Sequence, residues 1–249
     1  MARLIAGNWK MNGVSADLAE ALALAEDLKR QPAATRVALC APATLVERMS
    51  RVLAGSLVLV GGEDCHAEIS GAYTGDVSAE MLADAGAGLA IVGHSERRAF
   101  HGETDATVAA KALAARRAGL EPIICVGETL AEREAGRALE VVTAQVVGSV
   151  PSALAGSAVT VAYEPVWAIG TGLTPTIPQI EEVHRAVRRA LVEALGQAGA
   201  GVAILYGGSV KPSNAAEILS ADEVGGALVG GASLKAADFL KIVRAARAG

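Results

Sequence analysis

Five polar side chains in this sequence follow short apolar runs, at positions where strands of a sheet would end. They are Asn8, Lys10, His94, Glu96 and Glu164. A carboxylate and an imidazole can exchange a proton with a bound molecule, whereas an ammonium and an amide stabilise developing negative charge. Together these residue types predict a site that moves protons on a small anionic substrate.

Two glycine pairs follow the last two apolar runs of the chain. The first pair is Gly207-Gly208, followed by Ser209, and the second is Gly230-Gly231. Glycines expose backbone N–H groups, and N–H groups at the ends of the last strands of a β/α barrel form its usual phosphate site. The glycine pairs therefore indicate a phosphorylated ligand.

Each of these residues also has a simpler interpretation. Lys10 fits a solvated loop, His94 fits the cap of a helix because Ser and Glu follow it, and the glycines fit tight turns. Glu164 is harder to dismiss, because a carboxylate at the end of a buried strand loses hydration unless it has a function. The coincidence of all these positions at strand ends favours one shared site.

The elements that must position these residues follow from the hydrophobic pattern. Eight short apolar runs occupy residues 3–7, 36–41, 57–61, 88–93, 120–126, 157–163, 201–206 and 224–229. Longer segments with apolar residues three and four apart separate them, for example 15–28 and 180–195. Strands joined by helices of this length are parallel neighbours. The pattern predicts an α/β fold, an eight-stranded parallel (β/α)8 barrel, with residues 1–249 as a single domain.

The competing architecture is an open doubly wound sheet. Such a sheet usually carries a G-x-G-x-x-G turn after its first strand, and the first apolar run here lacks one. No linker rich in Pro, Gly or Ser divides the chain. The closed barrel is therefore preferred.

Composition limits the class of protein. The chain is 52% hydrophobic but only 3% aromatic, so its core must consist mainly of Ala, Val, Leu and Ile. The net charge of −5 argues against nucleic acid or an anionic membrane as a partner. Residues 1–10 lack the apolar segment of a signal peptide, and a cytoplasmic location is expected.

Cysteines and histidines give no sign of a disulfide or a metal site. Cys40, Cys65 and Cys125 are odd in number and lack C-x-x-C spacing, which predicts buried reduced thiols. The histidines outside the predicted site are His66, His101 and His184. They form no H-x-x-x-H pair and no set with carboxylates, so no metal is expected.

Six segments taken together closely resemble the triosephosphate isomerase family. They are residues 7–12, 71–75, 92–98, 163–172, 206–209 and 228–233, which span nearly the whole chain in order. The decapeptide 163–172 and the sequence His-Ser-Glu-Arg-Arg at 94–98 are the most specific. The resemblance implies a homodimer that interconverts dihydroxyacetone phosphate and D-glyceraldehyde 3-phosphate without a cofactor.

The resemblance also implies a role for each residue of the site. Glu164 is similar to the base that moves a proton between two carbons, and His94 to a neutral imidazole that polarises the carbonyl. The start of a helix would hold the pKa of His94 down. Lys10 would supply positive charge, Asn8 a hydrogen bond and Glu96 a second carboxylate.

A lid and a phosphate site are implied in the same way. Residues 165–175 resemble a mobile lid whose closure excludes water from the substrate. In that reading Gly170 gives a backbone N–H to the phosphate together with Ser209, Gly230 and Gly231. Residues 71–76 resemble a loop that inserts into the neighbouring subunit, where Thr74 would support Asn8. Dimerisation would then be a condition of activity.

Three positions depart from the family pattern. The second hinge of the lid, usually Lys-Thr-Ala or close to it, reads Leu173-Thr174-Pro175. Arg188 matches an arginine whose usual aspartate partner is Gly225 here, so that ion pair must be missing or replaced. Position 63 is Glu instead of the usual Gln. A buried, unpaired Glu63 would have a raised pKa, whereas for a solvated or paired one the change Glu63→Gln would be neutral or mildly destabilising.

Two other functions fit part of the pattern. Another phosphate-binding barrel, such as an aldolase or a synthase of the indole-glycerol-phosphate type, would also carry the glycine pairs. An aldolase would need a Schiff-base lysine on a middle strand, and none of the predicted strands offers one. A barrel that only binds phosphorylated ligands would not need Glu164 and His94, and both are present.

Overall fold

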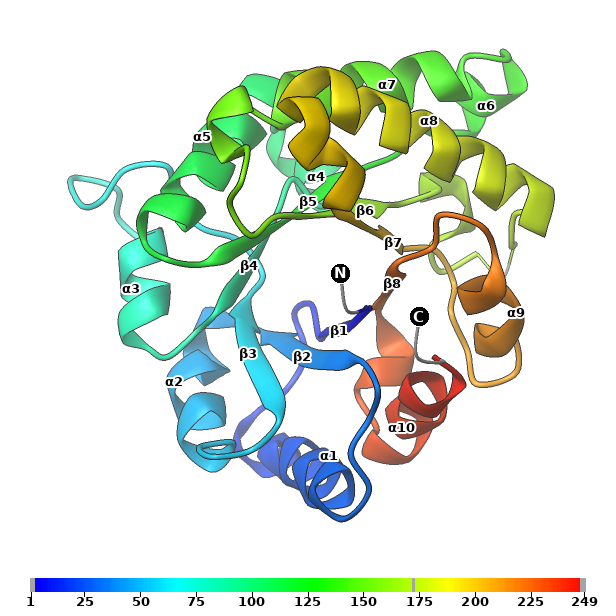
Figure 1. Ribbon diagram of the computed structural model, residues 1–249. Coiled ribbons are helices and arrows are strands. Elements are labelled where there is room, and N and C mark those ends of the chain that lie inside the picture. The colour runs from blue at the N-terminus through cyan, green and yellow to red at the C-terminus, as the bar shows by residue number, and fades with distance from the viewer. Residues whose placement is uncertain (1–2, 172, 247–249) are drawn as a thin grey trace.

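The computed structural model describes residues 3–171 and 173–246, which form a closed barrel of parallel strands surrounded by helices (Figure 1). The strands are β1 (Leu4–Asn8), β2 (Arg36–Ala41), β3 (Val58–Gly62), β4 (Leu89–Val92), β5 (Glu121–Val126), β6 (Thr160–Tyr163), β7 (Ala203–Tyr206) and β8 (Gly226–Val229). Each strand pairs with the next, and β8 returns beside β1, where Gly7 is opposite Val229. This closure confirms the barrel and excludes the open sheet.

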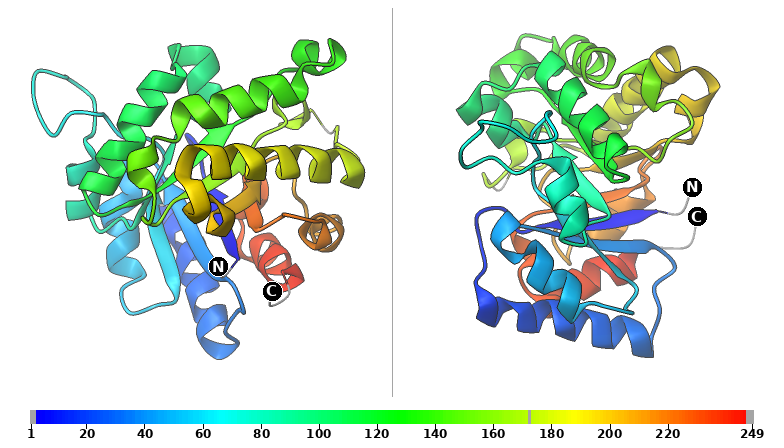
Figure 2. Two further views of the ribbon diagram at one scale, coloured as in Figure 1. Left: turned by 45° about the horizontal axis from the view of Figure 1, so that its top comes forward. Right: turned by 90° about the vertical axis from the view of Figure 1, so that its left-hand side faces the viewer.

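Helices connect successive strands and cover the outside of the barrel (Figures 1 and 2). They are α1 (Leu18–Arg30), α2 (Ala43–Val52), α3 (Ala79–Asp84), α4 (Ser95–His101), α5 (Asp105–Arg117), α6 (Leu130–Glu134), α7 (Ala138–Ser149), α8 (Ile177–Leu195), α9 (Ala215–Ser220) and α10 (Ala236–Ala245). Short 3-10 turns are η1 (Ser15–Asp17), η2 (Ser152–Leu154), η3 (Val166–Ala168), η4 (Gly196–Gly201) and η5 (Gly231–Ser233). No described helix is both long and apolar enough to cross a membrane.

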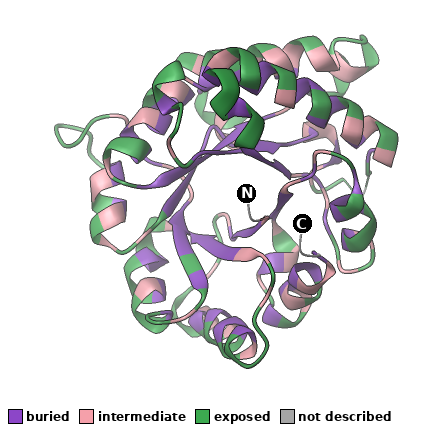
Figure 3. Ribbon diagram, viewed as in Figure 1, coloured by how far each residue is buried: buried purple, intermediate pink, exposed green. Residues whose placement is uncertain are grey.

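Apart from Leu59 of β3, the strands are largely buried on both faces, which explains their continuous apolar runs (Figure 3). Successive side chains of a strand point to opposite faces, so Leu4 and Ala6 of β1 fill the barrel while Ile5 packs under the helices. The inner cluster also includes Cys40 and Cys125. All three cysteines are free and buried, as predicted.

Polar residues fix where several helices begin. The Ser78 hydroxyl accepts a hydrogen bond from the Met81 amide at the start of α3, 3.2 Å away. Thr129 and Glu132 form a reciprocal capping box at the start of α6. Such caps satisfy N–H groups that a helix leaves unpaired, so the helices start at defined residues beyond the strand ends.

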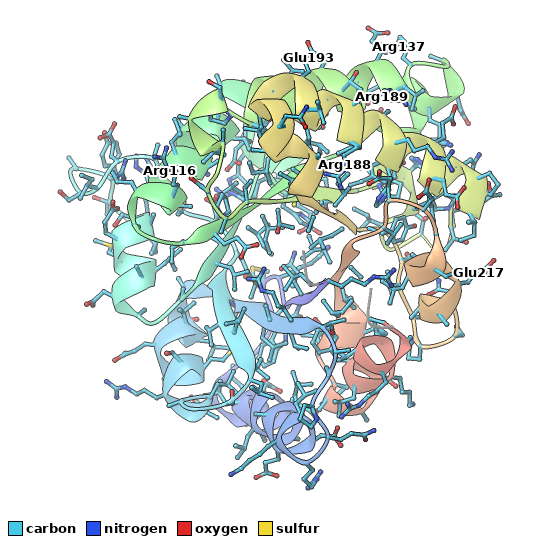
Figure 4. All side chains as sticks on the ribbon, in the orientation of Figure 1. Arg116, Arg137, Arg188, Arg189, Glu193 and Glu217 are labelled. Carbon is cyan, nitrogen blue, oxygen red and sulfur yellow. The ribbon has the colours of Figure 1, made fainter. Side chains whose placement is uncertain are left out.

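Arg188, whose usual aspartate partner is Gly225 in this chain, forms an ion pair with a different residue. Nε of Arg188 lies 3.0 Å from Oε2 of Glu223, two residues earlier in the chain than the usual aspartate. Arg188 reaches inward from α8, whereas Arg189 lies on the outer surface of the helix (Figure 4). Glu223 adopts a left-handed backbone conformation, with φ of 61°. That conformation is costly for a residue with a Cβ, so the Arg188 contact is maintained against backbone strain.

Candidate active site

The carboxyl ends of the strands meet at a cleft of about 400 Å³. Its lining includes the predicted residues Asn8, Lys10, His94, Glu164, Gly170, Ser209, Gly230 and Gly231. Gly207 and Gly208 also line the cleft, as does Lys211, which was not predicted from the sequence. The structure therefore gathers groups from β1, β4, β6, β7 and β8 around one space.

Glu164 lies directly after β6 and is 1% exposed. Its Oε2 accepts a hydrogen bond from the Ser95 amide at 2.9 Å, and its Oε1 accepts one from the Ser95 hydroxyl at 3.2 Å. Nε2 of His94 lies 2.8 Å from the same Oε1. A Cβ at Gly127 would stand 1.7 Å from the Glu164 carbonyl oxygen, so only glycine lets the neighbouring strand end approach this closely.

His94 is the N-cap of α4, and its ring orientation follows from that position. Nδ1 accepts a hydrogen bond from the Glu96 amide at 3.3 Å. A nitrogen that accepts from an amide carries no proton, so the neutral ring holds its proton on Nε2, which faces Glu164. The imidazole can thus donate a hydrogen bond to an oxygen in the cleft.

The charges of Glu164 and His94 depend on each other. Burial would raise the pKa of Glu164, but His94 and the Ser95 donors lower it, and the net shift is downward. Burial lowers the pKa of His94, yet the Glu164 carboxylate raises it, and the net shift is upward. The expectation that the start of the helix holds the pKa of His94 down is wrong for this conformation, because the carboxylate lies against Nε2. Glu164 is ionised at neutral pH, as a base requires.

Lys10 brings positive charge into the cleft. Its Nζ lies 2.5 Å from Oε1 of Glu96, and its backbone amide donates to Oδ1 of Asn8 at 3.1 Å. Its φ of 55° lies in the left-handed region, which few residues other than glycine adopt. Glu96 lies beside the cleft and acts through Lys10, and its Oε2 is also 3.6 Å from Nδ1 of His94.

Glu128, which was not predicted from the sequence, holds the first residues of the predicted lid. Its side chain is 0% exposed, and its Oε1 accepts hydrogen bonds from Nε1 of Trp167 at 2.9 Å and the Tyr163 hydroxyl at 3.1 Å. Arg133 forms a salt bridge with the same oxygen at 3.0 Å. The only sequence signal is a carboxylate beyond strand β5, which by itself resembles a surface residue.

The predicted lid continues beyond this anchor. The Ser209 hydroxyl donates to the carbonyl oxygen of Ala168 at 2.7 Å, and Gly170 faces the cleft. Leu173 is 53% exposed, whereas Pro175 is buried just before the capping box of α8. Gly172, also part of the expected lid, lies outside the described residues.

Thr74 lies outside the cleft of its own chain. It belongs to the exposed loop between β3 and α3. No group of three or more His, Cys, Asp or Glu side chains is placed to hold a metal within residues 3–171 and 173–246.

Glu63 follows β3 and lines a second cleft, of about 330 Å³, together with Arg97 and Lys111. Its Oε1 is buried without a hydrogen-bond partner. Burial raises the pKa of Glu63 to about 8, although the backbone amide of Lys10 lowers it. Glu63 as a whole is half-buried, but one buried oxygen without a partner and the raised pKa favour the desolvated carboxyl over a fully solvated one.

We expect Glu63→Gln to raise the melting temperature at pH 8. The folded pKa lies above the unfolded value of about 4.3, so stability falls as pH rises between the two and the full penalty applies above the folded value. A neutral amide removes a penalty of at least about 1 kcal/mol, which corresponds to about 2–4 °C, and changes little at pH 4.5. Melting curves of both proteins at the two pH values measure this. Equal shifts at both, or a loss at pH 8, would contradict a buried unpaired carboxylate.

Comparison with known proteins agrees with this geometry. The family model for triosephosphate isomerase matches residues 3–246. The triosephosphate isomerase of Caulobacter vibrioides is 62% identical over 97% of this chain and 96% of its own length, and that of Afipia carboxidovorans is 60% identical over the same shares. A crystal structure of triosephosphate isomerase from Bartonella henselae superposes with a TM-score of 0.91 at 47% identity, covering 98% of this chain and 99% of that one. The chain belongs to the triosephosphate isomerase family.

Proposed function

We propose that the chain interconverts dihydroxyacetone phosphate and D-glyceraldehyde 3-phosphate, as a step of glycolysis and gluconeogenesis. The observation that carries the proposal is the buried Glu164 carboxyl group 2.8 Å from Nε2 of His94, in a cleft that also contains Lys10 and the two glycine pairs. A coupled assay of glyceraldehyde 3-phosphate isomerisation by the purified protein tests it. No turnover above the uncatalysed rate would contradict it.

Each residue of the cleft has a role in proton transfer. Glu164 takes a proton from the carbon next to the carbonyl, which leaves a negative enediolate, and returns it to the neighbouring carbon. His94 donates from Nε2 to the enediolate oxygens, and Asn8 adds a second hydrogen bond. Lys10 supplies a fixed positive charge whose position Glu96 holds. Backbone N–H groups of Gly170, Ser209, Gly230 and Gly231 bind the phosphate.

Glu164 must leave Ser95 before it can reach substrate. In the structure both carboxylate oxygens contact donors of Ser95 and His94. These contacts hold the side chain in a position where it cannot take a proton from substrate. Rotation toward substrate would also remove its effect on the pKa of His94, and burial would then favour the neutral imidazole. A neutral imidazole is better matched to the transfer of protons between weakly acidic oxygens.

The lid predicts a measurable effect of Pro175. Proline fixes φ near −65° and removes one N–H, so this hinge has fewer open conformations. We expect Pro175→Ala to change kcat and KM together, because lid motion governs both substrate closure and product release. Since Pro175 is buried, a decrease of about 2–4 °C in melting temperature should accompany it. Steady-state kinetics and melting curves measure both, and unchanged kinetics would show that the hinge lies elsewhere.

The active form is a homodimer. Met11 is 97% exposed, Phe100 80% and Tyr73 45%, and all three lie in segments that follow strands β1, β3 and β4 at the carboxyl end of the barrel. Large apolar side chains exposed at one end of a barrel are typical of a surface that a partner covers. Thr74 would then support Asn8 of the partner. Sedimentation at micromolar concentration tests the dimer, and a monomeric protein with full activity would contradict it.

Three further expectations complete the proposal. Residues 1–249 form one domain, the enzyme needs neither metal nor cofactor, and it acts in the cytoplasm. Buried thiols without disulfides suit a reducing compartment. Dialysis against a chelator should leave the activity unchanged, whereas a loss that a divalent ion restores would contradict the metal-free chemistry.

A further inference from the structure

The loop between β3 and α3 contains nine consecutive exposed residues, 68–76, and projects from the edge of the barrel (cyan, Figures 1 and 2). A hollow of about 50 Å³ lies beside it, lined in part by Ser70 and Met81. A segment with so little buried surface gains little stability from packing. A defined loop conformation therefore needs specific contacts.

The hydrogen bonds of residues 68–76 within the described chain lead to two aromatic residues. The Glu68 amide donates to Nδ1 of His66 at 3.0 Å, and the Asp76 amide donates to the carbonyl oxygen of Tyr73 at 3.0 Å. The first bond fixes the start of the loop, and the second closes the turn at its tip. Neither bond connects the start to the tip.

The rings of His66 and Tyr73 make that connection. Their centroids are 4.1 Å apart with an angle of 35° between the ring planes. Nε2 of His66 also lies 3.7 Å from Oδ2 of Asp76, on the far side of the turn. The His66 backbone is itself fixed, because its amide donates to the carbonyl oxygen of Val77 at 2.8 Å.

Gly71 lets the Tyr73 ring fold back onto His66. A Cβ at this position would stand 2.9 Å from the Tyr73 ring, and the φ of Gly71 is 145°. A residue with a side chain here would push the ring away and adopt an unfavourable backbone conformation. The ring stack and the glycine together set the course of the loop up to Thr74.

We propose that His66 is a positioning residue, whose ring holds the tip of the loop 68–76 and so presents Thr74 to the neighbouring subunit. The proposal rests on the homodimer proposed above. His66 does not line the active-site cleft, so it acts through the loop and not on substrate. Its aromatic face is the part that matters, more than its hydrogen-bonding nitrogen.

Two variants separate the ring from the nitrogen. His66→Phe keeps an aromatic face but loses the acceptor for the Glu68 amide, whereas His66→Asn keeps an acceptor but loses the face. Hydrogen–deuterium exchange of residues 68–76 reports on the loop in each protein, and sedimentation reports the dissociation constant of the dimer. An aromatic pair changes a local equilibrium by about two- to ten-fold, and a symmetric dimer uses two loops, so the effect enters twice.

We expect His66→Asn and His66→Ala to exchange faster in the loop and to raise the dimer Kd by about ten-fold or more. Specific activity of these variants should fall on dilution and recover at high protein concentration, with kcat of the full dimer unchanged. His66→Phe should stay within about three-fold of the wild type in Kd. A permanent loss of kcat at every concentration would overturn the positioning role.

Three further results would contradict the proposal. If His66→Ala had the hydrogen–deuterium exchange rates and dimer Kd of the wild type, the loop would not depend on His66. If residues 68–76 stayed protected from exchange in His66→Asn but not in His66→Phe, Nδ1 and not the ring face would hold the loop. A wild-type protein that stays monomeric would overturn the proposed dimer, and with it the presentation of Thr74. The exchange measurement would still decide whether the ring holds the loop.

Discussion

Replacing Glu164 with Gln is expected to lower kcat by at least about a hundred-fold while the barrel stays folded. The amide has the shape of the carboxylate and its oxygen can still accept from the Ser95 amide, so the local structure should survive. It cannot take a proton from carbon, because a neutral amide is a very weak base. The isomerase assay measures kcat, and a melting curve shows whether the variant is folded.

A matched control separates this effect from the loss of any carboxylate. Glu217 lies on the outer surface of α9, away from the cleft (Figure 4), and is exposed. Glu217→Gln should therefore keep kcat within a factor of two or so. If Glu164→Gln also stays within a few-fold of the wild type, another group must be the base.

The barrel was predictable because its strands are buried on both faces. Residues 36–41 form β2 with the predicted bounds, and the other apolar runs also contain the observed strands or overlap them. Boundaries shift where small residues extend an apolar run past the paired segment. Residues 157–159, for example, precede the first paired residue of β6. Pairing, and not hydrophobicity, sets the end of a strand.

Helix starts were harder to place from periodicity alone. The segment 15–28 reads as one amphipathic helix, but Ser15–Asp17 form a 3-10 turn and α1 begins at Leu18. The segment 180–195 begins three residues earlier in the structure, at Ile177, where Thr176 and Gln179 form a capping box. Side chains that bond to the backbone decided these ends, and periodicity does not report them.

Contacts between distant segments account for what the sequence could not reveal in the site. The cleft residues were predictable because strand ends converge in a parallel barrel. The stored position of Glu164 depends on Ser95 and His94, which come 69 and 70 residues earlier and reach it only through barrel closure. The upward shift in the pKa of His94 has the same origin. The sequence around His94 shows the helix that it begins, but not the Glu164 carboxylate that follows β6.

Lys10 combines its proposed catalytic charge with backbone strain. Its φ of 55° costs about 1–3 kcal/mol for a residue with a Cβ, and the surrounding contacts must hold it there. Its salt bridge with Glu96 offsets little of this strain energy, because the two side chains are 26% and 43% exposed and water screens the pair. The strained conformation places the ammonium in the cleft beside the expected enediolate, so the strain serves function more than stability.

This conflict predicts that Lys10→Gly loses activity but is more stable than a variant that loses the same charge and keeps a Cβ. Loss of the ammonium leaves the Glu96 carboxylate unpaired near an anionic substrate, and kcat/KM should fall at least about a hundred-fold. Lys10→Met loses the same charge but keeps a Cβ at this φ, so it is the matched control. Glycine tolerates φ above zero, and we expect the Gly variant to melt about 2–4 °C above the Met variant, the equivalent of about 1 kcal/mol. Steady-state kinetics and melting curves of the three proteins measure both effects. Equal melting temperatures of the two variants would show that the backbone at residue 10 is not strained, and near-normal kcat/KM in either would show that its charge is not needed.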